Sequence, residues 1–179
     1  NEPRANHLIM DELGNEVMAD WFKIAQKHVK NPECKLFLNE YQIVSGTKDQ
    51  FKDKYEEHVQ FLLDQGAPLS GLGIQSRIKV RIPPATLYAS LERLAKFNLP
   101  IKATEFEVAD TPRKMFDEQE RAEITHEMLT TYFSHPNVTG FYVWTIFQNG
   151  TGPTRKTAKG EAPNHGWTSF IVHNDGRLK

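Results

Sequence analysis

The amino-acid sequence predicts an α/β fold in which parallel β-strands alternate with helices. Short β-prone stretches begin near residues 1, 35, 71, 101 and 138, at steps of roughly 30 to 38 residues. Stretches with helical spacing of apolar residues lie between them. The β-prone stretches are continuous apolar runs, as expected for strands that are covered on both faces. This alternation is typical of a parallel sheet built from βα units.

Composition and charge exclude several classes of partner. The 179 residues are enough for one domain with a sizeable core, and 39% hydrophobic with 25% charged residues are ordinary values for a globular protein. The net charge of −1 provides no field that would attract nucleic acid or an anionic membrane surface. Cys34 is the only cysteine, which excludes an intrachain disulfide. No apolar run approaches the ~20 residues of a membrane span. From the net charge and the absence of such a run, we expect no nucleic-acid partner and no membrane partner.

The first part of the chain predicts two helices and one intervening strand. Residues 4–15 are polar and predict a loop. Residues 16–29 predict a helix, residues 35–41 a strand, and residues 51–65 a second helix that ends at a Gly66 cap. Trp21 is expected in the core. The helix over 16–29 is expected to bury one face, formed by Val17, Trp21, Ile24, Ala25 and His28.

The second part of the chain predicts three strands and two helices. The helix over 83–97 has a proline in its first turn and is expected to bury Leu87, Leu91 and Leu94. The helix over 117–133 begins with Asp117 and Glu120, a pattern close to a capping box. The strands are expected at 71–75, 101–105 and 138–147. A long polar loop over 148–166 and a short extended stretch over 168–172 follow.

Polar side chains fall at the ends of the predicted strands. Right-handed crossovers bring the C-terminal ends of parallel strands to one edge, where α/β proteins carry their chemistry. The strand 101–105 is expected to end at Glu105, with Glu105 and Glu107 at the start of a loop. A single carboxylate at a strand end is as readily incidental as functional. The residues at or just past such ends are Glu2, Asn39, Gln75, Glu105 and Trp144.

Glu2 and Glu105 together suit the hydrolysis of a glycosidic bond. In a retaining mechanism the two carboxyl groups stand about 5–5.5 Å apart. One acts as the nucleophile, and the other acts first as acid and then as base. The acid must hold its proton near neutral pH while the nucleophile stays ionised, so their surroundings must differ.

Five motifs in chain order carry a family resemblance. Asn1-Glu2-Pro3 and Thr104-Glu105-Phe106 resemble the ends of the fourth and seventh strands of a retaining glycosidase barrel, where two glutamates stand. Residues 36–41 (LFLNEY), 71–76 (GLGIQS) and 141–144 (FYVW) resemble the fifth, sixth and eighth strands. More narrowly, the chain resembles glycoside hydrolase family 10, the endo-β-1,4-xylanases, over nearly its whole length. The resemblance implies a (β/α)8 TIM barrel.

The resemblance implies a role for each of these side chains. Glu2 would be the general acid/base and Glu105 the nucleophile. Asn1 would hydrogen-bond the nucleophile and the 2-hydroxyl of the sugar that is cleaved. Trp144 would form an apolar platform beneath the sugar ring. The remaining substrate-binding residues would be Asn39, Tyr41, Gln75 and Arg77.

The resemblance also implies partners and a location. Residues 1–179 would be the C-terminal portion of one catalytic barrel, with about strands four to eight and without the first three βα units and the last helix. A full barrel has eight strands and about 250 residues, and five strands alone would leave sheet edges open. The expected partners are therefore the missing N-terminal barrel segment and the polysaccharide substrate, xylan. We expect no cofactor and no metal, and a secreted or periplasmic protein, although the chain shows no signal peptide.

Two departures from the family keep alternatives open. Arg77 stands where a histidine is usual, and Gln42 stands where an asparagine is usual. A fixed cation at Arg77 would hold Glu105 ionised but would also weaken it as a nucleophile. The alternatives are a glycanase acting on another β-linked polysaccharide, such as β-glucan or mannan, and a non-catalytic glycan-binding remnant.

Overall fold

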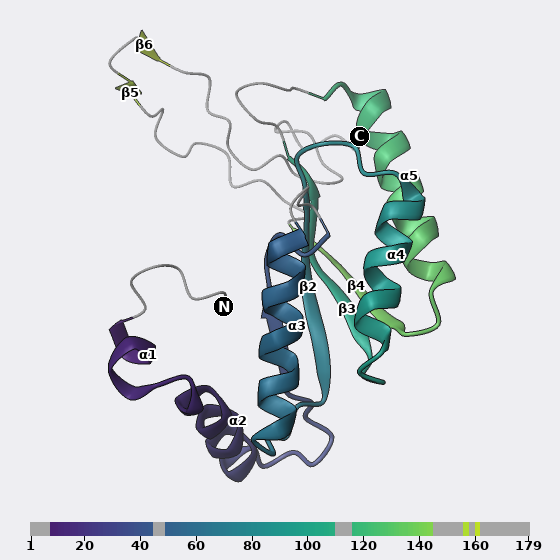
Figure 1. Cartoon of the computed structure of the whole chain (residues 1–179). Helices are drawn as coiled ribbons and strands as arrows, with labels where there is room; N and C mark the ends of the chain where they lie inside the picture. The colour runs from purple at the N-terminus through teal and green to yellow at the C-terminus, as the bar shows by residue number, and fades with distance from the viewer. Residues whose placement is uncertain (1–7, 45–48, 110–115, 145–155, 158–159, 162–179) are drawn as a thin grey trace.

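A parallel sheet of four strands forms the centre of the molecule. The computed structural model describes residues 8–44, 49–109, 116–144, 156–157 and 160–161. Within them the strand order is β1-β2-β3-β4, the order of the chain (Figure 1). The strands are β1 (Phe37–Glu40), β2 (Gly71–Ile78), β3 (Ile101–Val108) and β4 (Val138–Val143). A separate antiparallel pair consists of β5 (Lys156–Thr157) and β6 (Gly160–Glu161).

A helix joins each pair of neighbouring strands, as parallel pairing requires. α3 (Asp49–Asp64) lies between β1 and β2, α4 (Pro84–Ala95) between β2 and β3, and α5 (Glu118–Ser134) between β3 and β4. α1 (Leu8–Leu13) and α2 (Glu16–His28) precede β1. Figure 1 shows α4 and α5 side by side on one face of the sheet, with α3 along β2. The predicted alternation of strands and helices is confirmed for these elements.

The core lies between the sheet and these three helices. The predicted burial of Leu87, Leu91 and Leu94 on α4 is confirmed, since each is at most 1% exposed. Burying an aliphatic side chain of this size contributes roughly 1.5–3 kcal/mol. The sheet side of the core consists of Leu72, Ile74, Ile78, Ile101, Ala103 and Phe106. The helix side adds Tyr55, Val59, Leu62, Ile124, Met128 and Tyr132.

Two buried tyrosines connect the helices to the strands. The Tyr55 hydroxyl on α3 lies 2.8 Å from the carbonyl oxygen of Leu38 and 3.1 Å from that of Gly73. The Tyr132 hydroxyl on α5 lies 2.8 Å from the Ser76 hydroxyl. Because an unpaired buried hydroxyl costs free energy, these contacts favour one placement of α3 and α5 on the sheet.

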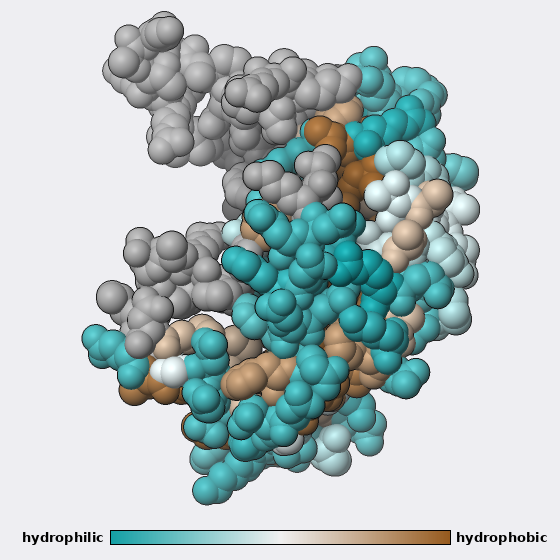
Figure 2. All heavy atoms as spheres, in the orientation of Figure 1, coloured by the Kyte–Doolittle hydropathy of each residue, from teal (hydrophilic) through white to brown (hydrophobic). Residues whose placement is uncertain are grey.

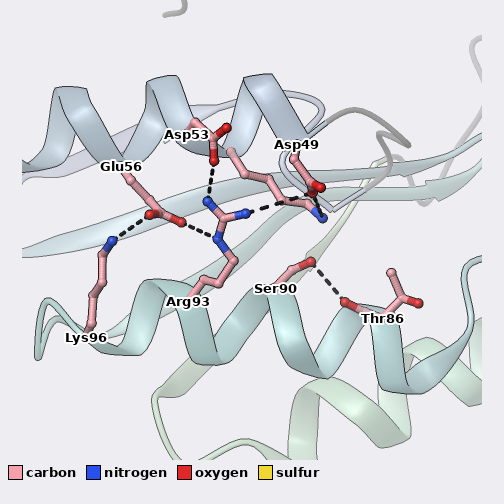
Figure 3. Close-up of polar contacts among 8 residues, drawn as sticks. Asp49, Asp53, Glu56, Thr86, Ser90, Arg93 and Lys96 are labelled. Atoms are coloured by element: carbon pink, nitrogen blue, oxygen red, sulfur yellow. Dashed lines mark hydrogen bonds and ion pairs between the residues drawn. The ribbon is translucent and has the colours of Figure 1, made fainter.

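Ion pairs join α3 to α4 on the outer surface (Figure 3). Arg93 donates from Nε to Glu56 and from Nη2 to Asp53, over 2.6 Å in both cases. Lys96 Nζ lies 2.5 Å from the second Glu56 oxygen. The Arg93 and Lys96 side chains are 36% and 54% exposed, so each pair contributes roughly 0–1 kcal/mol. The network therefore orients the two helices more than it stabilises them.

The N-terminal part of the fold differs from its prediction. Residues 8–13 form α1, so the loop predicted over residues 4–15 is wrong for this stretch. A helix of six residues is too short to show a hydrophobic period. It ends at Gly14, whose φ of +81° is typical of a helix C-terminus and whose N–H donates to the Met10 carbonyl over 2.9 Å.

α2 lies where it was predicted but buries a different face. Its buried side chains are Met18 and Ala19, whereas Trp21 is 44% exposed and Ile24 is 56% exposed. The predicted buried face and the core placement of Trp21 are therefore wrong. The reason is that α2 packs chiefly against α1, away from the layer formed by α4 and α5. Figure 2 shows hydrophobic side chains at the surface of this part of the molecule.

Local end signals were predicted well. Asp117 accepts from the Glu120 N–H over 2.8 Å, and the Glu120 side chain accepts from the Asp117 N–H, so the capping box of α5 is confirmed. Gly66 follows α3 with a φ of +65°, as expected of its cap. The loop predicted over 148–166 contains β5 and β6. Three predicted stretches lie outside the described residues: the strand near residue 1, residues 145–147 of the strand predicted over 138–147, and the extended stretch 168–172.

Candidate active site

A bulge in β3 determines how Glu105 is presented. Gln75 pairs with Thr104, but Arg77 pairs with Glu107, so two residues of β3 lie opposite the single residue of β2 between these pairs. The same extra residue lies between two of the pairs that β3 makes with β4, Ala103 with Phe141 and Phe106 with Val143. Glu105 has a φ of +51° at this point, a conformation that costs a non-glycine residue roughly 1–2 kcal/mol. Retained strain of this kind motivates a functional hypothesis.

The predicted end of this strand is wrong. The strand was expected to end at Glu105, with Glu107 in a loop, but β3 continues to Val108. The bulge interrupts the alternation of inward and outward side chains, so the pattern resembles the end of a strand. The carboxylate pair Glu105 and Glu107 consequently lies within the sheet, near its carboxyl edge.

Arg77 of β2 is the centre of the site. Its Nη2 and Nε donate to the same oxygen of Glu105, over 2.6 Å and 3.1 Å. Its Nη1 lies 3.8 Å from Glu107 Oε1, and its guanidinium carbon lies 5.1 Å from the ring centroid of Trp144. The N–H of Trp144 donates to the Phe106 carbonyl over 2.8 Å, which ties the residue after β4 to the bulge. Arg77 therefore links the carboxylate of Glu105 to the indole of Trp144.

Glu107 is the buried member of the cluster. It is 3% exposed, and its Oε2 makes no hydrogen bond within the described part of the chain. Burial raises the pKa of Glu107 to about 7, against the opposing effects of Arg77 and Lys79 and with a further increase from Glu105. Burial therefore favours the protonated form of Glu107 more than it would at an exposed position. No role for Glu107 was predicted from the sequence, although its spacing two residues from Glu105 was visible.

A glycine allows Asn39 to reach across β2. Thr104 Oγ1 on β3 donates to Asn39 Oδ1 on β1 over 2.6 Å. The two strands are separated by β2, and Gly73 of β2 pairs with Asn39. A Cβ at Gly73 would lie 2.5 Å from Asn39 Oδ1, so only glycine leaves room for this contact. This hydrogen bond fixes the Asn39 side chain beside Thr104, the residue that precedes Glu105.

The structure brings together part of the predicted site. Asn39, Gln75, Arg77 and Glu105 lie on adjoining parts of β1, β2 and β3, connected by strand pairing and by the contacts above. Trp144 joins them through Arg77.

Of the remaining predicted residues, the structure describes only Tyr41. Tyr41 follows β1, and its ring lies 6.5 Å from that of Phe51 on α3. Asn1 and Glu2 lie outside the described residues, so the separation of the two glutamates stays a prediction. In the described segments, no group of three or more His, Cys, Asp or Glu side chains is arranged to hold a metal ion. No helix among those segments is long and apolar enough to cross a membrane.

A parallel sheet with its strands in chain order, helices on one face and polar side chains near its carboxyl edge is typical of part of a (β/α)-barrel enzyme. The family model described as Glycosyl hydrolase family 10 matches residues 2–160. The chain therefore belongs to glycosyl hydrolase family 10. This confirms the predicted family and the predicted partial barrel.

Known proteins agree with this assignment. The chain is 32% identical over 179 residues to endo-1,4-beta-xylanase 1 of Arabidopsis thaliana, a match that covers 98% of the chain and 18% of that relative. The GH10 xylanase from Bispora sp. MEY-1, solved with xylobiose, superposes with a TM-score of 0.73 at 20% identity, over 96% of this chain and 51% of that one. Xylanase 10B from Thermotoga petrophila RKU-1, also solved with xylobiose, gives 0.66 at 24% identity, over 78% and 42%. The chain thus spans about half of these structures or less.

Proposed function

We propose that the chain contributes to a retaining endo-β-1,4-xylanase, which hydrolyses xylan by double displacement. The observation that carries this proposal is the presentation of Glu105. It stands on a bulge with a positive φ, accepts two hydrogen bonds from Arg77, and is joined through Arg77 to an aromatic platform at Trp144. Membership of glycosyl hydrolase family 10, together with the match to endo-1,4-beta-xylanase 1 of Arabidopsis thaliana, supports the choice of substrate.

The proposed mechanism has two steps. Glu105 attacks the anomeric carbon while Glu2 donates a proton to the leaving glycosidic oxygen, which forms a covalent glycosyl-enzyme. Glu2 then takes a proton from water, and the water oxygen displaces Glu105 from the anomeric carbon. Arg77 holds one oxygen of Glu105, so that the second oxygen is available for attack. Trp144 would stack beneath the sugar ring, and Asn1, Asn39, Tyr41 and Gln75 would contact its hydroxyls.

The first test is Glu105→Gln in the longest natural polypeptide that contains this chain, here called the whole polypeptide. We expect the release of reducing sugar from xylan to fall on the order of 10⁴-fold or more, since a nucleophile is lost. Glu57→Gln is the matched control, because Glu57 lies exposed on α3 away from the site. Full activity in Glu105→Gln would refute the assignment of the nucleophile.

The polysaccharide is tested separately from the chemistry. Initial rates on xylan, mixed-linkage β-glucan and mannan would show the preferred backbone. We expect the highest kcat/KM on xylan. A higher value on β-glucan or mannan would keep the two-glutamate mechanism and change the substrate.

One observation favours a second candidate, a non-catalytic glycan-binding protein. Two donors of Arg77 are directed at the same oxygen of Glu105, over 2.6 Å and 3.1 Å, which weakens that carboxylate as a nucleophile. Calorimetric titration with xylohexaose, followed by analysis of the sugar for cleavage, distinguishes the two candidates. Binding without turnover in the whole polypeptide, with turnover gained in Arg77→His, would establish the second.

We also propose that further βα units complete the barrel and that the protein acts in a secreted or periplasmic location. The exposed Trp21 and Ile24 on α2 support the first proposal, because an added unit would cover them. X-ray scattering by the chain alone tests the first proposal, and a closed, monodisperse monomer would contradict it.

The proposed location is supported by the size of the substrate, since a polysaccharide is too large to cross a membrane. Immunodetection in culture medium and cell fractions tests it.

A further inference from the structure

Lys102 of β3 lies on the face of the sheet that is turned away from α4 and α5. Its neighbours Ile101 and Ala103 are 0% exposed beneath the helices, and successive side chains of a strand point to opposite faces. Lys102 itself is half-buried. The hydrogen-bonded side chains of Asn39 and Thr104 share this face. In a closed barrel this face becomes the interior.

Two glycines allow Phe37 and Lys102 to approach each other across the sheet. A Cβ at Gly71 would lie 2.2 Å from the Phe37 ring, so this ring lies over β2. A Cβ at Gly140 would lie 3.2 Å from Lys102 Cγ, so the lysine stem lies over β4. Lys102 Nζ lies 4.6 Å from the centroid of the Phe37 ring and 5.6 Å from that of the Tyr142 ring. The ammonium group is therefore in contact with two aromatic rings.

Lys102 has no counter-charge among the residues that the structure describes. Its Nζ makes neither an ion pair nor a hydrogen bond within that part of the chain. The faces of the rings attract the cation, but the N–H groups of an ammonium also need acceptors. Tyr142 beside it is 51% exposed, so solvent reaches this part of the face and can supply them.

Closing the barrel would cover this face with further strands. The chain spans 51% of the Bispora xylanase and 42% of the Thermotoga petrophila xylanase, so those structures extend well beyond it. Each interior layer of a (β/α)8 barrel takes its side chains from alternate strands. Phe37 on β1 and Lys102 on β3 stand on alternate strands and approach each other across β2. The rest of their layer would therefore come from alternate strands of the added βα units.

We propose that one of those added strands carries an inward Asp or Glu that pairs with Lys102. The proposal rests on the proposed completion of the barrel by further βα units. A buried ammonium is costly without a counter-charge, and the rings of Phe37 and Tyr142 carry none. A carboxylate both neutralises the ammonium and accepts its N–H groups. The partner of this face is thus a βα segment with an acidic side chain in the layer of Phe37 and Lys102.

The first test is Lys102→Met in the whole polypeptide, which removes the ammonium and keeps most of the side-chain volume. The proposed carboxylate would be left buried and unpaired, so we expect the urea midpoint at pH 7 to fall by about 1–2 M. Protonation relieves an unpaired carboxylate, so this loss should shrink toward about pH 4.5. Lys54→Met, at an exposed position on α3, is the matched control and should keep the parent midpoint at both pH values. A Lys102→Met midpoint at or above that of the parent, or a loss that does not change with pH, would overturn the proposal.

The acidic partner is located by double-mutant cycles. Each inward Asp or Glu on the alternate strands of the added units is changed singly to Asn or Gln. The variant of the true partner should lower the midpoint in the parent but add little in Lys102→Met, because the pair is already broken there. Losses that add independently at every candidate, or the absence of an acidic residue from those strands, would refute the pairing.

Chemical labelling checks the covering of Lys102 without a substitution that could impair folding. In the whole polypeptide, acetic anhydride should modify Lys102 about tenfold or more slowly than the exposed Lys54, as measured by mass spectrometry of peptides. Equal rates at the two lysines would contradict the proposal. Midpoints and labelling rates do not depend on turnover. A failed xylanase assay would therefore refute the proposed catalytic function, while these measurements decide the pairing of Lys102 by themselves.

Discussion

Gly73→Ala should lower the free energy of unfolding because the added Cβ would crowd Asn39, and shortening Asn39 should remove most of this effect. The new Cβ would lie 2.5 Å from Asn39 Oδ1, 3.1 Å from its Cγ and 3.0 Å from its Cβ. The Asn39 amide would have to rotate away and would lose the 2.6 Å bond from Thr104. Overpacking costs about 1–3 kcal/mol and the lost hydrogen bond about 0.5–1.5 kcal/mol. We therefore expect the free energy of unfolding to fall by about 2–4 kcal/mol.

The same substitution should cost less when Asn39 is already shortened. Asn39→Ala removes Oδ1 and Cγ and leaves only the contact at 3.0 Å. In that background Gly73→Ala should cost under about 1 kcal/mol, which gives a coupling energy of about 1–3 kcal/mol between the two sites. Urea unfolding of the parent, the two single variants and the double variant measures this coupling.

Gly66→Ala is the matched control for this cycle. Its Cβ would meet no atom within 4 Å, but its φ of +65° disfavours a side chain. It should cost about 1 kcal/mol with or without Asn39→Ala. A coupling below about 0.5 kcal/mol between Gly73 and Asn39 would refute the steric argument.

Three further predictions concern stability. The folded state raises the pKa of Glu107 from 4.5 to about 7, so it binds more protons than the unfolded chain between these values. Stability should therefore fall as pH rises from 4.5 to 7, and thermal unfolding should show this slope flattened in Glu107→Gln. Leu91→Ala should cost about 2–5 kcal/mol in urea unfolding, whereas Leu13→Ala, at a side chain 64% exposed, should stay within about 0.5 kcal/mol. Asp117→Ala should cost about 1 kcal/mol through the lost cap, and an unchanged urea midpoint would contradict this.

The elements that could be predicted are those with strong local signals. The buried leucines of α4 repeat at helical spacing, and Asp117 with Glu120 form a known start signal for a helix. Continuous apolar stretches such as residues 71–74 are expected for strands of a parallel sheet whose two faces are both covered. α2 shows where such reasoning fails. Its apolar spacing correctly predicted a helix that buries one face, but the face was wrong. Which side of a helix is covered depends on the elements packed against it.

The site could be predicted in its residue types but not in its geometry. Glu105, Gln75 and Asn39 were visible as polar residues near the ends of apolar strands. The bulge was not visible, since an extra residue in a strand leaves only a break in alternation. The contact between Asn39 and Thr104 spans 65 positions and depends on an intervening glycine, a three-strand relation that no local pattern shows.

The bulge explains why Arg77 and Glu105 must be considered together. In regular alternation Glu105 would share a face with Ile101 and Ala103, which are 0% exposed beneath the helices. The extra residue lets Phe106 take that core position and turns Glu105 toward Arg77. The positive φ of Glu105 costs roughly 1–2 kcal/mol, while a hydrogen bond between charged groups contributes about 1.5–3 kcal/mol. Arg77 restrains the carboxylate of Glu105 and also offsets the strain of the Glu105 backbone, so it stabilises this placement of Glu105 whichever of the two proposed functions holds.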